Sequence, residues 1–273
     1  MKNDAMKTLF VAAILCVACS ILVSGAAVLL KPAQEANKVL DVKKNLLLAS
    51  GLIEEPVTPE EINQAYTQIQ AEVIELETGE PTDIEAATFS QEKASKDPEM
   101  NKVIDPKADI AGIKVRSKYA PAYKYLKDGS LEMLVLPIKG KGLWSTLYGF
   151  LALDKDLRTV RGLGFYAHGE TPGLGGEIDN PKWKAIWKGK KAFDENFDDV
   201  KITVVKGAVD SSDPKSEYKV DGLSGATITS NGVTFLVQYW LGDDGFGPYL
   251  ARLRSQQDLT DSADPSSEET QEQ

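Results

Sequence analysis

Leu131-Glu-Met-Leu-Val-Leu-Pro-Ile138 is the first of three apolar runs that follow one another closely in the chain. The other two are Leu147–Leu153 and Thr159–Tyr166, and Ile202–Val209 is a further run of the same kind. Short connections that contain glycine, such as Lys139-Gly-Lys-Gly142, separate the runs and are typical of turns. The pattern predicts successive β-strands.

Helical segments are expected on either side of these strands. Pro181–Lys188 and Ser230–Leu241 have helical patterns, so the whole predicts an α+β domain around a mixed or antiparallel sheet, flanked by helices. Upstream, Thr58 and Glu61 form a capping box, and apolar residues recur at helical spacing after them. This segment predicts a helix that stops at Gly79.

The N-terminal region has the pattern of a membrane anchor. From Thr8 to Leu30 there are about 23 residues without a charge, and a helix needs roughly 20 apolar residues to cross a bilayer. A retained anchor is favoured over a cleaved signal peptide, for which Ser24-Gly-Ala26 would be the cleavage site, and over a lipoprotein, for which Cys16-Val-Ala-Cys19 is an imperfect box. Lysines on both sides of the span leave its orientation open.

The chain is therefore expected to divide into five parts. These are a short tail (1–7), a transmembrane anchor (8–30), a juxtamembrane and helical region (31–90), a main domain (91–254) and a disordered acidic tail (255–273). The formal net charge is −10 and no basic patch offsets it, so nucleic acid is not an expected partner.

Several common chemistries are excluded. Both cysteines lie in the apolar N-terminal stretch and the chain has one histidine, so neither a disulfide framework nor an ordinary zinc site is expected. Gly162-Leu-Gly-Phe-Tyr-Ala167 spells a dinucleotide fingerprint, but a loop follows it where a helix should begin. Gly222-Leu-Ser-Gly-Ala226 lacks the last glycine of a nucleophile elbow.

Two segments stand out from the rest. The loop His168-Gly-Glu-Thr-Pro-Gly-Leu-Gly-Gly176 has four glycines, which let the backbone approach a flat ligand closely. Asp221-Gly-Leu-Ser-Gly-Ala-Thr-Ile-Thr-Ser230 surrounds Thr227 with small residues before an expected helix, whose N-terminus would favour phosphate. Composition alone favours a plainer interpretation of Thr227, a helix cap that contributes about 1 kcal/mol.

The same residues carry a family resemblance. The Ser-Gly-Ala-Thr segment resembles the flavinylation site of the FMN-binding domain family, which occurs in the C-subunit of the sodium-translocating NADH:quinone oxidoreductases and in the G-subunit of Rnf-type complexes. Gly140-Lys-Gly-Leu-Trp144 and His168–Gly175 resemble two further family signatures. The likeness covers the anchor and the domain to about Arg254. The long region between anchor and domain favours the C-subunit.

The resemblance implies where the cofactor sits. It makes Thr227 the attachment point, through a phosphoester to FMN, and not a catalytic nucleophile. The surrounding residues that match what the flavin transferase recognises are Asp221, Gly222, Ser224, Gly225 and Ala226. The ring is expected against Trp144, Leu174 and the backbone of Gly173–Gly176, which includes Gly175, with Glu170 and Thr171 as candidates for polar contacts.

The resemblance also implies the setting. The chain would be an electron carrier between NADH, oxidised elsewhere, and quinone, in a sodium-transporting membrane complex. Its partners would be the other subunits of that complex and, during maturation, the flavin transferase. The domain would stand on the periplasmic, outer face of a bacterial inner membrane. The alternatives are the G-subunit of an Rnf-type complex and a membrane-anchored binding module without redox chemistry.

Overall fold

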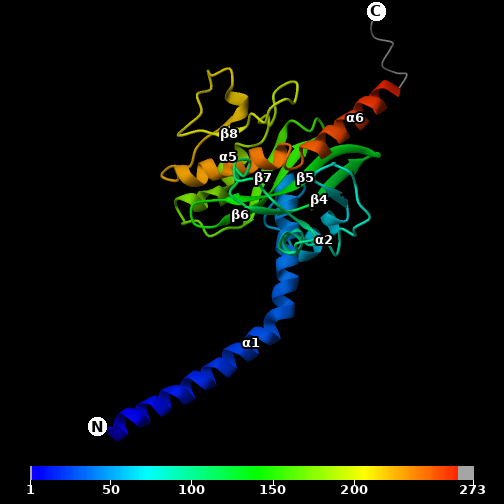
Figure 1. Ribbon diagram of the computed structural model, residues 1–273. Helices are drawn as coiled ribbons and strands as arrows, with labels where there is room; N and C mark the ends of the chain where they lie inside the picture. Colours follow the sequence, from blue (N-terminus) through cyan, green and yellow to red (C-terminus); the bar gives the residue numbers. More distant parts are fainter. Residues whose placement is uncertain (1, 264–273) are drawn as a thin grey trace, which may run out of the picture. The chain divides into compact units, whose positions relative to one another are not determined.

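The computed structural model describes residues 2–263, and the chain separates into two compact units, one ending at Val42 and the other beginning at Lys43. The described residues of the first unit all lie in helix α1, which runs over Lys2–Ser50 (Figure 1). From Ala5 the helix contains a stretch that is long and apolar enough to cross a membrane, by length and composition. Its apolar side chains are exposed, which suits contact with lipid.

The second unit is built on one five-stranded sheet in the order β1-β4-β5-β6-β7. Every neighbouring pair is antiparallel. The α+β fold with an antiparallel sheet and flanking helices is thus confirmed. The strands are β1 (Ile69–Glu75), β4 (Tyr119–Lys127), β5 (Ser130–Lys141), β6 (Thr146–Asp154) and β7 (Val160–Ala167).

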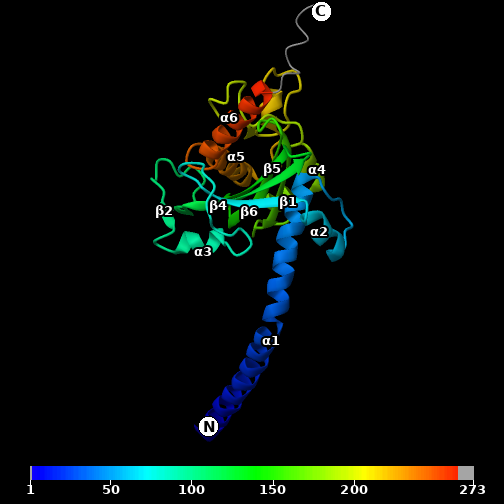
Figure 2. The same ribbon diagram turned by 90° about the vertical axis from the view of Figure 1, so that its right-hand side faces the viewer.

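One face of the sheet is covered by helices α5 (Thr227–Leu241) and α6 (Gly247–Ala263), as Figure 2 shows. Close approach is possible because Gly140 lies under α5, where an added Cβ would come within 2.4 Å of the Leu236 Cβ. The buried side chains between sheet and helices include Leu134, Leu136, Leu151, Leu163, Val233, Val237 and Trp240. This packing fixes the start of α5 beside the turn between β5 and β6.

The opposite face receives the last turns of α1. Side chains alternate along a strand, so Gly162 and Gly164 face away from the α5 side to which Leu163 belongs. An added Cβ on Gly162 would lie 2.2 Å from the carbonyl oxygen of Ala49. The Arg161 guanidinium closes this helix end, since its Nε donates to the Ser50 carbonyl at 3.0 Å. Both glycines of the apparent dinucleotide fingerprint therefore serve helix packing.

Shorter elements complete the unit. They are α2 (Pro59–Tyr66), α3 (Gln91–Lys96), β2 (Asn101–Val103), β3 (Val115–Ser117), the 3-10 turn η1 (Gly175–Asp179), α4 (Pro181–Ala185), β8 (Thr203–Val204), the 3-10 turn η2 (Ser216–Tyr218) and β9 (Lys219–Val220). Strands β2 and β3 pair antiparallel, whereas β8 and β9 pair in parallel.

The prediction of a single helix that runs to Gly79 is wrong beyond Tyr66, after the first two turns. The capping box at Thr58 is present, but α2 ends at Tyr66 and the chain continues as β1. Ile69 and Val73 are four residues apart, and that spacing places two side chains on one face of a strand as well as of a helix. Pairing with β4 along its whole length decides for the strand.

Other expected boundaries also need correction. The main domain does not begin at residue 91, because β1 and the end of α1 belong to its sheet and core. The strand expected over Ile202–Val209 is reduced to β8. The tail expected to be disordered from residue 255 is helical through Ala263 as part of α6, and residues 264–273 lie outside the described part of the chain.

Candidate functional site

The start of α5 is open. Thr227 is the first residue of the helix and is exposed, while the capping position belongs to Ala226, which offers no side-chain hydrogen bond. The interpretation of Thr227 as an N-cap is therefore wrong. Because the first N–H groups of a helix have no intrahelical partner, this end presents free donors and positive potential beside the Thr227 hydroxyl. Such an end binds phosphate readily.

Hydrogen bonds to the rest of the domain fix the segment that precedes Thr227. The Asp221 carboxylate accepts the Val209 N–H at 2.8 Å, and its carbonyl accepts the indole N–H of Trp183 at 2.8 Å. Ser230 accepts the Leu223 N–H through its hydroxyl at 3.1 Å. Asp221 thus fixes the backbone of the segment through these contacts.

The glycine-rich loop lies against this segment. Gly225 has a φ of +72°, and an added Cβ there would meet the Leu174 side chain at 3.0 Å. Leu174 is 45% exposed. The Thr171 carbonyl holds the loop in shape by accepting the N–H groups of Leu174 (3.1 Å) and Gly176 (2.9 Å). The structure therefore brings the two segments singled out from the sequence together.

The turn between β5 and β6 supplies the third side of the site. It closes through the Gly142 N–H, which donates to the Ser145 carbonyl at 2.8 Å. Trp144 at its tip is 68% exposed, and Leu143 beside it is 43% exposed. A large indole left in solvent is uncommon in a packed domain and marks a surface for a ligand or a partner.

Glu170 joins these parts. Its side chain is buried, and its carboxylate accepts the N–H groups of Leu143 (3.1 Å), Trp144 (2.9 Å) and Ser145 (3.2 Å) and the Thr229 hydroxyl (2.6 Å). Burial raises the pKa of Glu170, but these four donors outweigh it and hold the pKa below its usual value. Glu170 was expected to contact the ligand; here its oxygens are engaged by the protein itself.

His168, the one histidine, fixes the start of the loop. Its Nδ1 accepts the Glu170 N–H at 3.2 Å, which places the ring proton on Nε2, and that nitrogen lies 2.6 Å from an Asp179 carboxylate oxygen. Both ring nitrogens are thus used to orient Glu170 and η1.

The surroundings of Thr227 suit a phosphate that carries a flat, apolar ring system. The uncapped helix end suits the phosphate, and the exposed side chains of Trp144 and Leu174 offer faces to the ring. The sequence did not single out Leu143 or Thr229. Leu143 was detectable as an apolar residue beside Trp144, whereas only the three-dimensional contact with Glu170 shows the part that Thr229 plays.

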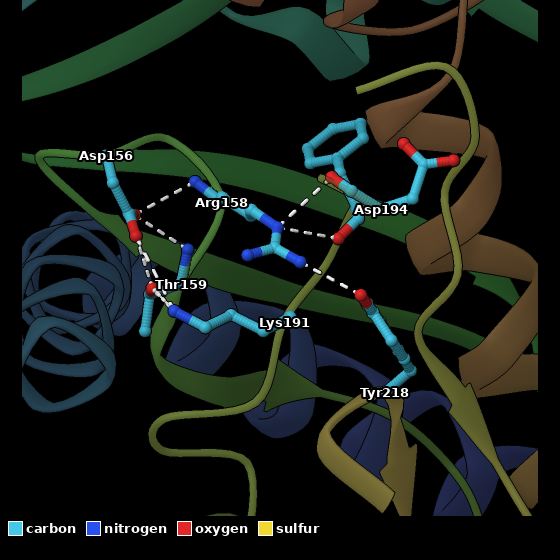
Figure 3. A network of polar contacts seen from close by, with 7 residues as sticks. Asp156, Arg158, Thr159, Lys191, Asp194 and Tyr218 are labelled. Carbon is cyan, nitrogen blue, oxygen red and sulfur yellow. Dashed lines mark hydrogen bonds and ion pairs between the residues drawn. The ribbon is translucent and has the colours of Figure 1, made fainter. Parts of the chain in front are cut away.

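A polar network supports the long segment that leads back to Asp221 (Figure 3). Arg158, on the turn between β6 and β7, donates through Nε to the carbonyls of Phe193 (2.9 Å) and Asp194 (3.1 Å). It also donates to the Tyr218 hydroxyl at 2.9 Å. Since Tyr218 precedes β9 and Asp221 follows it, this arginine anchors one end of the segment that carries the site.

A second hydrogen-bonded carboxylate, that of Asp156, lies on the Arg158 turn and belongs to this network; unlike that of Glu170, its side chain is exposed. Partial burial raises the pKa of Asp156, but the hydroxyl and N–H of Thr159, the Arg158 N–H and the charge of Lys191 outweigh it and leave the pKa lowered. Asp156 is thus a hydrogen-bonded carboxylate outside the site.

The fold and site define an FMN-binding domain: residues 142–242 match the family of that description, and the match takes in residues from all three motifs. Among curated relatives, the C-subunit of the Na⁺-translocating NADH-quinone reductase of Pseudomonas aeruginosa is 47% identical over 255 residues, which is 93% of this chain and 97% of that protein. The corresponding protein of Yersinia pestis is 45% identical over 93% of this chain and 95% of its own length.

Solved structures agree with these relatives. The crystal structure of Shewanella oneidensis NqrC superposes with a TM-score of 0.73 at 34% identity, covering 81% of this chain and 99% of that chain. The C-subunit from Parabacteroides distasonis gives a TM-score of 0.61 at 27% identity, covering 80% and 96%. The chain belongs to the NqrC family, the C-subunits of the Na⁺-translocating NADH-quinone reductases, and the preference for this family over the Rnf type is confirmed.

Proposed function

We propose that Thr227 carries FMN covalently, through a phosphoester between its hydroxyl oxygen and the flavin phosphate. The observation that carries this proposal is the exposed hydroxyl of Thr227 on the first residue of a helix with no side-chain cap. The free N–H groups of that end stabilise the negatively charged phosphate of the product. The bond between the Thr227 oxygen and the flavin phosphorus forms as the bond from that phosphorus to the leaving group of an activated flavin donor breaks. The leaving group takes the bonding electrons, and the hydroxyl proton passes to water.

The bound flavin supplies the redox chemistry, since it exchanges one or two electrons. The chain's own residues place it. Trp144 and Leu174 give the ring apolar faces, and the loop backbone is open to it at Gly173, where an added Cβ would meet no atom within 4 Å. Because these side chains are exposed, the flavin stays accessible to a neighbouring subunit while the covalent bond prevents its loss.

In this proposal the chain relays electrons in the path from NADH to quinone, within a Na⁺-translocating complex like those for which its relatives are named. Helix α1 anchors it in a bacterial inner membrane with the flavin domain on the outer face. Residues 8–30 hold no charged side chain, so ion transport belongs to the other subunits of the complex. A flavin transferase is the partner needed for maturation.

The test uses the full chain co-expressed with its flavin transferase, denatured and run on a gel under ultraviolet light. The wild-type band should fluoresce and the Thr227→Ala band should be dark. Ser211→Ala is the matched control, since it removes an exposed hydroxyl outside the Asp221–Thr227 segment and should remain fluorescent. A dark wild-type band beside an active transferase, or a fluorescent Thr227→Ala band, would overturn the proposal.

A further inference from the structure

We propose that Glu170 is the positioning residue of the flavin site: its carboxylate couples the turn that carries Trp144 to the first turn of the helix that carries Thr227. The inference rests on the proposed attachment of FMN to Thr227. It assigns Glu170 no contact with the flavin. Its task is to fix the distance and angle between the indole and the attachment point.

The two carboxylate oxygens of Glu170 accept hydrogen bonds from different partners. Oε1 accepts the N–H groups of Trp144 and Ser145, at 2.9 and 3.2 Å. Oε2 accepts the Leu143 N–H at 3.1 Å and the Thr229 hydroxyl at 2.6 Å. Three successive N–H groups that converge on one anion form a nest, so the turn depends on the carboxylate for its shape. Thr229 lies two residues after Thr227, within the same helical turn.

Two glycines show how tightly the carboxylate is enclosed. An added Cβ on Gly142 would lie 2.6 Å from Oε1, and one on Gly175 would lie 2.7 Å from Oε2 and 2.5 Å from the Thr229 hydroxyl oxygen. Neither position admits a side chain. The glycine-rich loop, the turn and the helix start therefore meet around a single charged group, with no room to slide past one another.

The ionised form is required. A carboxylate can accept at all of these positions, whereas a protonated or amide group must turn a donor toward one of them. All four partners are neutral donors: three backbone N–H groups and one hydroxyl. Hydrogen bonds to a charged acceptor are about twice as strong as neutral ones, so Glu170→Gln should loosen the turn while leaving the shape of the side chain nearly unchanged.

The test measures the flavin–indole contact in the flavinylated full chain, purified in detergent. An indole stacked on a flavin quenches its fluorescence, so the readout is the ratio of flavin fluorescence in the native and the denatured protein. The ratio counts only attached flavin and is independent of flavinylation yield. Glu170→Gln should raise the ratio at least twofold. Glu170→Asp, one methylene shorter, should restore only part of the quenching.

Asp156→Asn is the matched control, because Asp156 is a hydrogen-bonded carboxylate outside the site. It should lower the unfolding temperature without changing the ratio. If Glu170→Gln does not accumulate, Thr229→Val takes its place. Thr229→Val should raise the fluorescence ratio by less than is expected for Glu170→Gln, and Thr229→Ser should restore the wild-type ratio. An unchanged ratio in Glu170→Gln or, in its absence, in Thr229→Val overturns the proposal, as does an equal rise in Asp156→Asn. Loss of flavin from the wild-type chain would instead overturn the attachment itself.

Discussion

Ala49 and Gly162 meet backbone to backbone, so closely that a Cβ on Gly162 would stand 2.2 Å from the Ala49 carbonyl oxygen. The last turns of α1 therefore rest directly on β7. Leu46 and Leu47, from the same turns, are fully buried. This contact packs the last turns of α1 against the sheet that carries the proposed FMN site.

Gly162→Ala should destabilise the sheet unit by about 1–3 kcal/mol, because the added methyl group collides with backbone that cannot rotate away. Gly164→Ala is the matched control. Its Cβ would meet the Ala49 Cβ at 3.4 Å, an ordinary contact, so it should cost much less. Thermal unfolding of the full chain in detergent, followed by tryptophan fluorescence, measures both. Equal losses would show that helix α1 does not press on Gly162.

The sequence predicted the strands of this sheet where their apolar runs are long and bounded by glycine, as in β5, β6 and β7. It predicted Thr227 and the glycine-rich loop through a family resemblance. It did not predict β1, because Ile69 and Val73 satisfy strand and helix spacing equally and only pairing with β4 separates the two. The role of Glu170 was also out of reach, since its four partners come from segments 25 to 59 residues away.

Gly225→Ala should lower the yield of covalently attached flavin by more than its loss of folding stability accounts for. Alanine at a φ of +72° costs about 1–2 kcal/mol, and its methyl group would also push on Leu174 at 3.0 Å. Gly129→Ala is the control, with a φ of +81° and no atom within 4 Å of the added Cβ. Both variants should lose similar stability, and only Gly225→Ala should give a weaker fluorescent band. A weaker band in both would trace the effect to stability alone.

Arg158→Met should destabilise the segment that leads to Asp221. It removes three hydrogen bonds from a charged donor, of which each contributes about 1.5–3 kcal/mol, although the losses are not additive. Tyr218→Phe removes one of them and should cost about 1.5 kcal/mol, the lower end of that range. Urea unfolding of both single variants and the double variant gives the coupling between them. A coupling energy near zero would contradict the contact drawn in Figure 3.

Acidification should loosen the contact between the attached flavin and the indole of Trp144, which quenches its fluorescence. The pKa of Glu170 is lowered in the folded chain, because the hydrogen bonds from Thr229, Trp144, Ser145 and Leu143 outweigh the effect of burial. Its contribution to stability is therefore present above the ordinary glutamate pKa of about 4.3 and is lost as the pH falls through the lower folded value. The native-to-denatured fluorescence ratio should stay constant from neutral pH to about 4.3 and rise below it. Glu170→Gln should abolish this rise, and a rise that persists in it would assign the acid transition to another group.

The pairing of β1 with β4 determines where a fragment must begin if the domain is to be expressed alone. The family match begins at residue 142 and the sequence suggested a boundary at 91, yet β1 pairs with β4 along all seven of its residues. A fragment that starts after β1 would leave the N–H and C=O groups of β4 unpaired along an open edge. Unpaired edges of this kind recruit strands from other molecules, so such a fragment is expected to aggregate, whereas one that begins near Lys43 keeps the edge covered.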